Sequence, residues 1–214
     1  MSEKTVYLDN NATTMVDPQV FEAMKPYFCD LYGNPSSMHE FGGQVMHAVD
    51  KAREQVKDFL GARDAKEIIF TASGSEGDNM AIRGVLEANK NKKHIITTKI
   101  EHPAVLNVYK YLEKQGYDVT YLDVDSKGNL DLNQLAESIT DETALVSIMY
   151  ANNETGVILP VEKAAKIVKA KNPKIKFHSD AVQAAGKIPL DVKNTDIDLL
   201  TIAGHKIHAP KGIG

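Results

Sequence analysis

Hydrophobic positions in the first 65 residues follow a helical period. Apolar side chains recur every three or four residues over 45–60 and stop at Gly61, which predicts a helix ending in a glycine cap. Asp17 is followed by a proline, the usual start of a helix, so a second helix is expected over residues 18–28. The turn-forming stretch 33–37 separates the two.

Beyond residue 65, short apolar segments alternate with helical patterns. Six segments have strand character: Ile68–Phe70, His94–Thr98, Val119–Leu122, Ala144–Met149, Ile175–Ser179 and Leu199–Ile202. The helices expected between them run to about residue 89 and over residues 104–115, 132–139 and 161–171. Buried strands that alternate with helices predict an α/β fold, in which a mostly parallel sheet lies between two helical layers in a three-layer α/β/α unit.

Composition narrows the class of protein. The chain has 214 residues, 43% of them hydrophobic, and a formal net charge of −4. It therefore lacks the composition of a disordered chain and the basic surface of a nucleic-acid-binding protein. No apolar run approaches the about 20 residues of a membrane span, and the polar start is no signal peptide. The single cysteine, Cys29, favours a reducing, cytoplasmic location, and we expect it to be a buried or partly buried thiol.

Polar residues follow four of the predicted strands. They are His102, Asn153, Asp180 and Lys206. Because the carboxyl ends of parallel strands meet at one edge of a sheet, we expect these side chains to share a rim, where ligands of such folds bind.

A small-residue loop, Ser73–Gly77, connects the first predicted strand to a helix. Exposed backbone N–H groups and the helix dipole would make it an anion site. A plain tight turn with Ser75 as the helix N-cap explains the same residues equally well. The loop matches neither a dinucleotide-binding fingerprint nor a Walker A motif.

Each rim residue taken alone has an ordinary structural explanation. Asp180 is either a helix cap or the partner of a protonated pyridine nitrogen, and His102 is either structural or a proton carrier. Lys206 is either a solvated charge or, with a lowered pKa, a Schiff-base amine. His205 and His208 could form a metal pair, but no third ligand stands near them and we predict no metal. Taken together, a phosphate loop, a histidine, an asparagine, an acid and a lysine on successive strand ends favour one cofactor, pyridoxal 5′-phosphate.

Six motifs carry a family resemblance: Tyr7–Thr14, Tyr32–Ser37, Glu101–Val105, Ala151–Gly156, His178–Gln183 and Gly204–Gly212. Through these motifs the chain resembles cysteine desulfurases of the NifS/IscS type, which are class V, fold-type I enzymes that use pyridoxal phosphate. The resemblance implies that Lys206 binds the cofactor covalently, Asp180 pairs with its ring nitrogen and Gln183 bonds its ring hydroxyl. It implies that His102 stacks on the ring and transfers protons, and that Asn153 lies beside the cofactor and the substrate carboxylate.

The resemblance also assigns the phosphate group of the cofactor. Gly74, Ser75 and His205 would hold it. Ala203 stands where the family often has a serine, so one hydroxyl contact with the phosphate would be absent here.

The activity implied is conversion of L-cysteine to L-alanine by a homodimer. The sulfur would pass as an enzyme persulfide to an iron–sulfur cluster scaffold or another acceptor. Residues 14–214 would be the cofactor-binding large domain, incomplete at its C-terminal end, and residues 1–13 would belong to a small domain. Family members continue for nearly as many residues again, and their nucleophilic cysteine lies there. Cys29 does not match it, so the chain alone is expected to be inactive.

Two alternatives stay open at this point. The same cofactor residues would serve a selenocysteine lyase or another class V reaction. The second alternative is that the chain is a non-catalytic split subunit that needs a second chain.

Overall fold

A five-stranded sheet forms the centre of the computed structural model, which describes residues 5–214. All pairings are parallel, and the strand order is β2-β1-β3-β4-β5. The strands are β1 His94–Thr98, β2 Asp118–Leu122, β3 Thr143–Ser147, β4 Lys176–Asp180 and β5 Leu199–Thr201. These five agree with the predicted strands to within two residues at each end.

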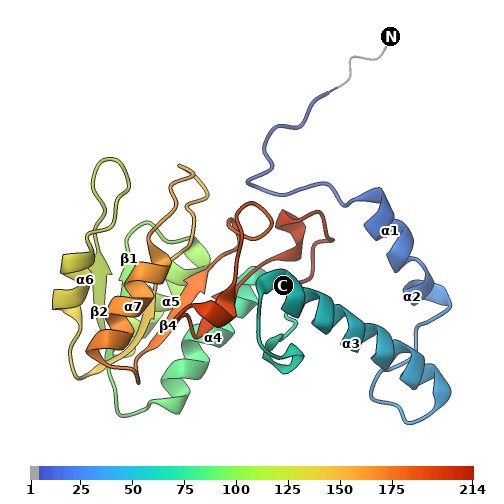
Figure 1. The fold of residues 1–214 in the computed structure, drawn as a ribbon, viewed down its shortest axis with the longest axis horizontal. Helices are drawn as coiled ribbons and strands as arrows, with labels where there is room; N and C mark the ends of the chain where they lie inside the picture. Colours follow the sequence, from blue (N-terminus) through green and yellow to red (C-terminus); the bar gives the residue numbers. More distant parts are fainter. Residues whose placement is uncertain (1–4) are drawn as a thin grey trace.

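Helices cover both faces of the sheet (Figure 1). One face packs against α4 Gly74–Ala88 and α5 Pro103–Lys114, and the other against α6 Leu132–Ser138 and α7 Val161–Lys171. Ile95 and Ile96 of β1 are both fully buried, one in each of the two apolar clusters, because successive strand residues point to opposite faces. The three-layer α/β/α prediction is confirmed.

The strand order places a topological switch point between β1 and β3. The chain passes from β1 to β2 at the edge of the sheet and then returns to the other side of β1 as β3. Loops that leave β1 and β3 diverge at such a point and open a crevice at the carboxyl edge. His102 and Asn153 lie on these two loops.

The N-terminal helices differ from the prediction. The expected helix over 18–28 is two helices, α1 Pro18–Met24 and α2 Pro26–Cys29, because Pro26 cannot donate the hydrogen bond that would continue the first. Neither helix buries a residue, and in Figure 1 both lie well away from the sheet. The expectation that Cys29 is buried or partly buried is therefore wrong, since the residue is exposed.

Helix α3 spans Glu40–Leu60 and begins five residues earlier than its apolar period indicated. Its end agrees with the prediction. Gly61 adopts a left-handed conformation with φ of 63° and caps the helix.

The segment Ile68–Phe70 is not a strand. It follows a short 3₁₀ turn, η1 Ala65–Glu67, and among the described residues it pairs with no strand. At its end, Thr71 exchanges two backbone hydrogen bonds of 2.8 Å with Gly214. An apolar cavity of about 1040 Å³ is lined by both this segment and β5. Within residues 5–214 this apolar segment therefore lines the cavity and is not a strand of the sheet.

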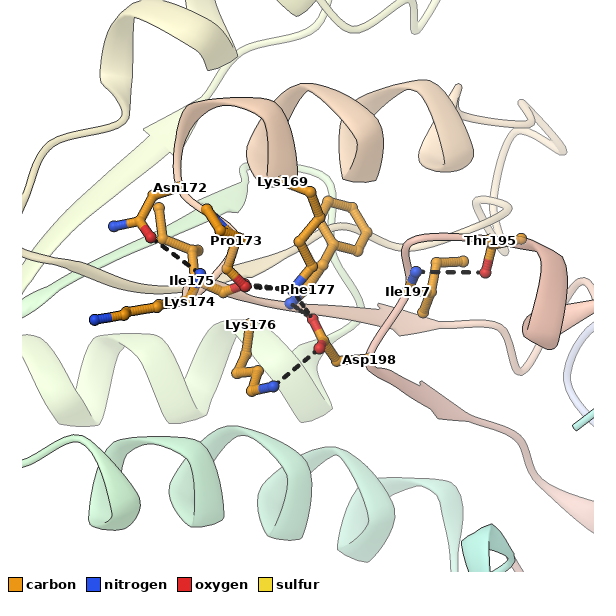
Figure 2. Close-up of polar contacts among 10 residues, drawn as sticks. All are labelled: Lys169, Asn172, Pro173, Lys174, Ile175, Lys176, Phe177, Thr195, Ile197 and Asp198. Carbon is orange, nitrogen blue, oxygen red and sulfur yellow. Dashed lines mark hydrogen bonds and ion pairs between the residues drawn. The ribbon is translucent and has the colours of Figure 1, made fainter. Parts of the chain in front are cut away.

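The amino ends of β4 and β5 are joined by a polar cluster around Asp198 (Figure 2). The Asp198 carboxylate accepts hydrogen bonds from Lys169 Nζ at 2.5 Å, Lys176 Nζ at 3.1 Å and the Phe177 backbone N–H at 2.7 Å. This cluster ties α7 to both strands at the end of the sheet opposite the rim. Among residues 5–214, none of the helices combines the length and apolar character that crossing a bilayer requires.

Candidate functional site

Asp180 is the last residue of β4 and lies at the carboxyl edge of the sheet, only 5% exposed. Its Oδ1 accepts a hydrogen bond from the Val182 N–H at 2.9 Å, and no described residue donates one to Oδ2. Burial raises the pKa of this carboxyl, while the Val182 N–H and the neighbouring His102 and Lys206 oppose the rise. A buried carboxylate with one uncommitted oxygen is a suitable partner for a cationic ligand atom.

Lys206 ends the 3₁₀ turn η3 Gly204–Lys206, which begins three positions after the last residue of β5. Its Nζ donates hydrogen bonds to the carbonyl oxygens of Asn11 and, at 2.9 Å, Ala12. Burial and the nearby Lys187 lower the pKa of Lys206, against the opposite effect of Asp180. A lowered pKa increases the fraction of neutral amine, which is the form that attacks a carbonyl carbon.

Asn11 connects several predicted site residues. Its carbonyl oxygen also accepts a hydrogen bond from Gln183 Nε2 at 2.9 Å, and its side-chain Nδ2 donates to the Asn153 carbonyl at 3.3 Å. The strand-end pattern contained no sign of Asn11, because it precedes every strand of the sheet. Only its place in the motif Tyr7–Thr14 pointed to it.

The N-terminal segment is joined to the loop around Lys206. His205 Nδ1 lies 3.0 Å from Thr13 Oγ1, and the His205 carbonyl accepts hydrogen bonds of 2.9 Å from both the N–H and the hydroxyl of Thr14. Burial and the positive charges of Lys206 and Lys211 lower the pKa of His205. His205 is therefore neutral near pH 7 and would contact a phosphate as a hydrogen-bonding group.

His208 is also bound to this segment, in a left-handed conformation with φ of 64°. Its N–H donates to Thr14 Oγ1 at 2.9 Å, and its Nδ1 lies 3.0 Å from the Met15 carbonyl. Within the described part of the chain no group of three or more possible metal ligands occurs.

The small-residue loop forms the N-terminus of α4. Its N-cap is Ser73, whose Oγ accepts the Glu76 N–H at 3.1 Å, and not Ser75, which is exposed inside the first turn. Gly74 is buried, and a Cβ at this position would lie 3.0 Å from Val182 Cγ2 and 3.3 Å from Ala203 Cβ.

These contacts place three of the predicted phosphate residues around one point. The fold brings Gly74 and Ala203 side by side at the start of a 15-residue helix, with Ser75 next in the chain. The helix N-terminus supplies backbone N–H groups and a partial positive charge for an anion.

His102 caps the N-terminus of α5 with its side chain exposed at the rim. Its Nδ1 accepts the Ala104 N–H at 3.1 Å, which places the proton of a neutral imidazole on Nε2. A protonated His102 would lower the pKa of Asp180, so the two residues lie within electrostatic reach of each other.

Asn153 is half-buried in the loop after β3, and its Nδ2 donates to Glu154 Oε1 at 2.9 Å. The preceding Asn152 holds this loop in place. Its Nδ2 donates to the Ile100 carbonyl at 3.0 Å, and its Oδ1 accepts the Glu154 and Thr155 N–H groups at 2.9 Å. The loops after β1 and β3 are thus joined on either side of the switch point.

The fold and this site define a class of protein. The chain belongs to the aminotransferase class-V family, whose model matches residues 6–214. The family resemblance seen in the sequence is confirmed.

Particular relatives are similar over nearly the whole chain. A cysteine desulfurase of Nostoc sp. is 64% identical over 98% of this chain and 52% of its own length. Cysteine desulfurase NifS of Azotobacter vinelandii is 52% identical with the same coverage. The chain therefore spans about half the length of the curated relatives it matches.

Solved structures agree with the fold. A NifS-like protein superimposes with a TM-score of 0.95 at 46% identity, over 98% of this chain and 57% of that one. A structure described as SspA in complex with cysteine gives a TM-score of 0.93 at 41% identity, over 98% and 60% of the two chains.

Proposed function

We propose that this chain is the cofactor-binding part of a pyridoxal-phosphate-dependent cysteine desulfurase that converts L-cysteine to L-alanine. The relatives that it matches at 64% and 52% identity are named cysteine desulfurases. The observation that carries the proposal is the position of the buried Asp180 and of Lys206 at one edge of the sheet, where Lys206 and Gln183 both donate to the Asn11 carbonyl.

The residues present fit the cofactor. Asp180 Oδ2 takes no hydrogen bond from a described residue and suits a protonated ring nitrogen, and Gln183 has a side-chain amide beside the same strand end. The first turn of α4, Gly74 and the exposed Ser75, provides helix-terminal backbone N–H groups that a phosphate could accept from. Bound there, pyridoxal phosphate would withdraw electrons from the substrate's α-carbon.

Each side chain then has a defined task. Asp180 holds the positive charge at the ring nitrogen. Lys206 supplies the amine for covalent attachment, for which its Nζ must leave the carbonyl oxygens of Asn11 and Ala12. His102 can donate a proton from Nε2, because its Nδ1 already accepts the Ala104 N–H.

Sulfur transfer needs a thiol that the chain does not place at the rim. In the proposed reaction a cysteine thiolate attacks the substrate sulfur, the substrate C–S bond breaks, an S–S bond forms, and a proton replaces sulfur on carbon to give L-alanine. Cys29 lies in α2, far from the sheet in Figure 1. We propose that this thiol comes from the region that the relatives have beyond the matched half.

Location, oligomeric state and the sulfur acceptor are features of the whole protein. We propose a cytoplasmic homodimer that passes persulfide sulfur to an iron–sulfur cluster scaffold or another acceptor. The family resemblance and the names of the relatives support this, and a pull-down with sulfur-acceptor proteins would test it.

Borohydride reduction tests the cofactor assignment. In a full-length protein loaded with pyridoxal phosphate, we expect reduction to fix the cofactor covalently on Lys206, because burial and the nearby Lys187 lower the pKa of its amine. Peptide mapping would locate the adduct. A Lys206→Arg variant should give no adduct, and an adduct on Lys187 or Lys211 would contradict the assignment.

A further inference from the structure

Thr14 is buried in an N-terminal segment that is otherwise mostly exposed. It is 4% exposed, whereas residues 5–12 are exposed throughout. The hydroxyl uses both its proton and a lone pair, because Oγ1 donates to the His205 carbonyl at 2.9 Å and accepts the His208 N–H at 2.9 Å. The Thr14 backbone N–H donates to the same His205 carbonyl at 2.9 Å. Three hydrogen bonds thus bind one residue to the chain on both sides of Lys206.

The Thr14 hydroxyl stands where the turn η3 would otherwise continue. The turn has hydrogen bonds of the 3₁₀ type, donated by the N–H groups of Lys206 at 3.2 Å and Ile207 at 3.0 Å. The next bond of this series would run from the His208 N–H to the His205 carbonyl. Within residues 5–214 that bond is not formed, because both groups bind Thr14. A side chain that inserts into a helical hydrogen-bond series bends or ends the helix, so Thr14 ends the turn just after Lys206.

His208 shows the consequence for the backbone. In the described part of the chain it is the only residue other than glycine with a positive φ, 64°, whereas a continued 3₁₀ turn would keep φ negative. The same N-terminal segment holds it there, since the Asp17 N–H donates to the His208 carbonyl at 3.0 Å and the His208 Nδ1 lies 3.0 Å from the Met15 carbonyl. The chain after Lys206 therefore leaves in a direction that η3 alone would not set.

Lys206 lies between the two groups that Thr14 binds. Its Nζ donates to the carbonyl oxygens of Asn11 and, at 2.9 Å, Ala12, which stand three and two positions before Thr14. One short stretch of the chain therefore holds both the backbone and the amine of Lys206. If η3 continued for another residue, the backbone over residues 205–208 would shift relative to that stretch, and the amine would lose its two carbonyl partners.

Substitution separates the hydroxyl of Thr14 from its methyl group. Valine keeps the branched shape and removes the hydroxyl, whereas serine keeps the hydroxyl and removes the methyl group. A threonine that only fills space would tolerate valine better than serine. A threonine that ends the turn through its hydroxyl would tolerate serine better than valine.

We propose that Thr14 is a positioning residue for Lys206: its hydroxyl ends the turn η3 after this lysine and holds the amine at the rim of the sheet. The proposal rests on the proposed function only for the reaction that the amine would carry out.

The test is an NMR measurement, on the chain without cofactor at about pH 6, of how fast the ammonium protons of Lys206 exchange with water. In the wild-type chain we expect slower exchange than at the exposed Lys51, because two carbonyl oxygens accept from the Lys206 Nζ. Thr14→Val should speed the exchange at least about threefold, the effect of losing a hydrogen bond, and should move the backbone chemical shifts of His208 toward helical values. Thr14→Ser should stay within about twofold of the wild type, because the hydroxyl remains.

Thr143→Val is the matched control. Thr143 is fully buried at the amino end of β3, where its hydroxyl lies 2.7 Å from His94 Nδ1 and accepts the Thr140 N–H at 2.9 Å. Removing this hydroxyl costs stability without touching the rim. The exchange of the Lys206 ammonium should therefore stay unchanged in this variant.

The proposal is overturned if the Lys206 ammonium of the wild-type chain exchanges as fast as that of Lys51. It is also overturned if Thr14→Val keeps the wild-type rate, if Thr14→Ser exchanges at least about threefold faster than the wild type, or if Thr143→Val speeds the exchange as much as Thr14→Val. The wild-type rate and the serine variant decide the matter even if the valine variant fails to fold. Because no cofactor is present, a failure here is distinguishable from a failure of the borohydride test.

Discussion

Asp180 and Lys206 carry opposite charges in surroundings that shift both toward the neutral form. Burial raises the pKa of Asp180 and lowers that of Lys206, and each opposes the shift of the other. This mutual support depends on the fold bringing to one rim two residues that are 26 positions apart in the chain. Asp180 or Lys206 taken alone is explained as a helix cap or a solvated charge. The two together at one rim are not explained in that way.

Replacing Asp180 tests this electrostatic role. A charge-assisted hydrogen bond contributes about 1.5–3 kcal/mol, so Asp180→Ala should weaken pyridoxal phosphate binding to a full-length protein roughly ten- to a hundredfold. Asp180→Asn keeps the size and loses the charge, so it should weaken binding to a similar degree. Dissociation constants from absorbance titration would measure both. Near-normal affinity in the asparagine variant would rule out the charge as the cause.

Residues at strand ends were predictable because strand periodicity and parallel topology place them without any contact information. His102, Asn153, Asp180 and Lys206 all lie at the carboxyl edge, as expected. Their assigned roles in binding stay predictions. The strand pattern could not indicate Asn11, because its contacts with Lys206 and Gln183 depend on how the N-terminal segment packs against the rim.

At the scale of elements, the local sequence pattern was sufficient to predict a helix or strand where its apolar period matches the residues that the fold buries. The five strands of the sheet and the glycine cap at Gly61 are examples. The local pattern was insufficient where forming a strand requires pairing with a segment that is distant in the chain. Ile68–Phe70 is as apolar as a strand, yet β5 lies at the edge of the sheet and no strand pairs with this segment in residues 5–214.

The Asp198 cluster gives a prediction for element packing. Asp198→Ala removes a carboxylate that is 20% exposed and leaves Lys169 and the Phe177 N–H without it. Loss of hydrogen bonds to a partly buried charge should lower the free energy of unfolding by about 2–3 kcal/mol. Urea denaturation of both chains would measure this difference.

An exposed ion pair serves as the control for that experiment. Asp123 pairs with Lys99 at 2.7 Å, and its side chain is 63% exposed. Asp123→Ala should change the free energy of unfolding by less than about 1 kcal/mol. Equal losses in the two variants would mean that the Asp198 cluster does not hold α7, β4 and β5 together.

At the scale of the whole molecule, the N-terminal segment is the least predictable feature. Residues 11–15 cross from the exposed N-terminal helices to the loop around Lys206, through hydrogen bonds to His205 and His208. These bonds join residues about 190 positions apart, which no local pattern can indicate. The assignment of residues 1–13 to a small domain stays a prediction, and residues 1–4 lie outside the described part.

The measurement that tests the account most directly is alanine formation from L-cysteine by this chain joined to the second half of its Nostoc relative. We expect the 214-residue chain alone to form no alanine above the rate of free pyridoxal phosphate. The chimera should form alanine, Lys206→Ala should abolish this, and Cys29→Ser should not affect it. An active Lys206→Ala chimera, or alanine formation by the chain alone that Cys29→Ser abolishes, would contradict the account.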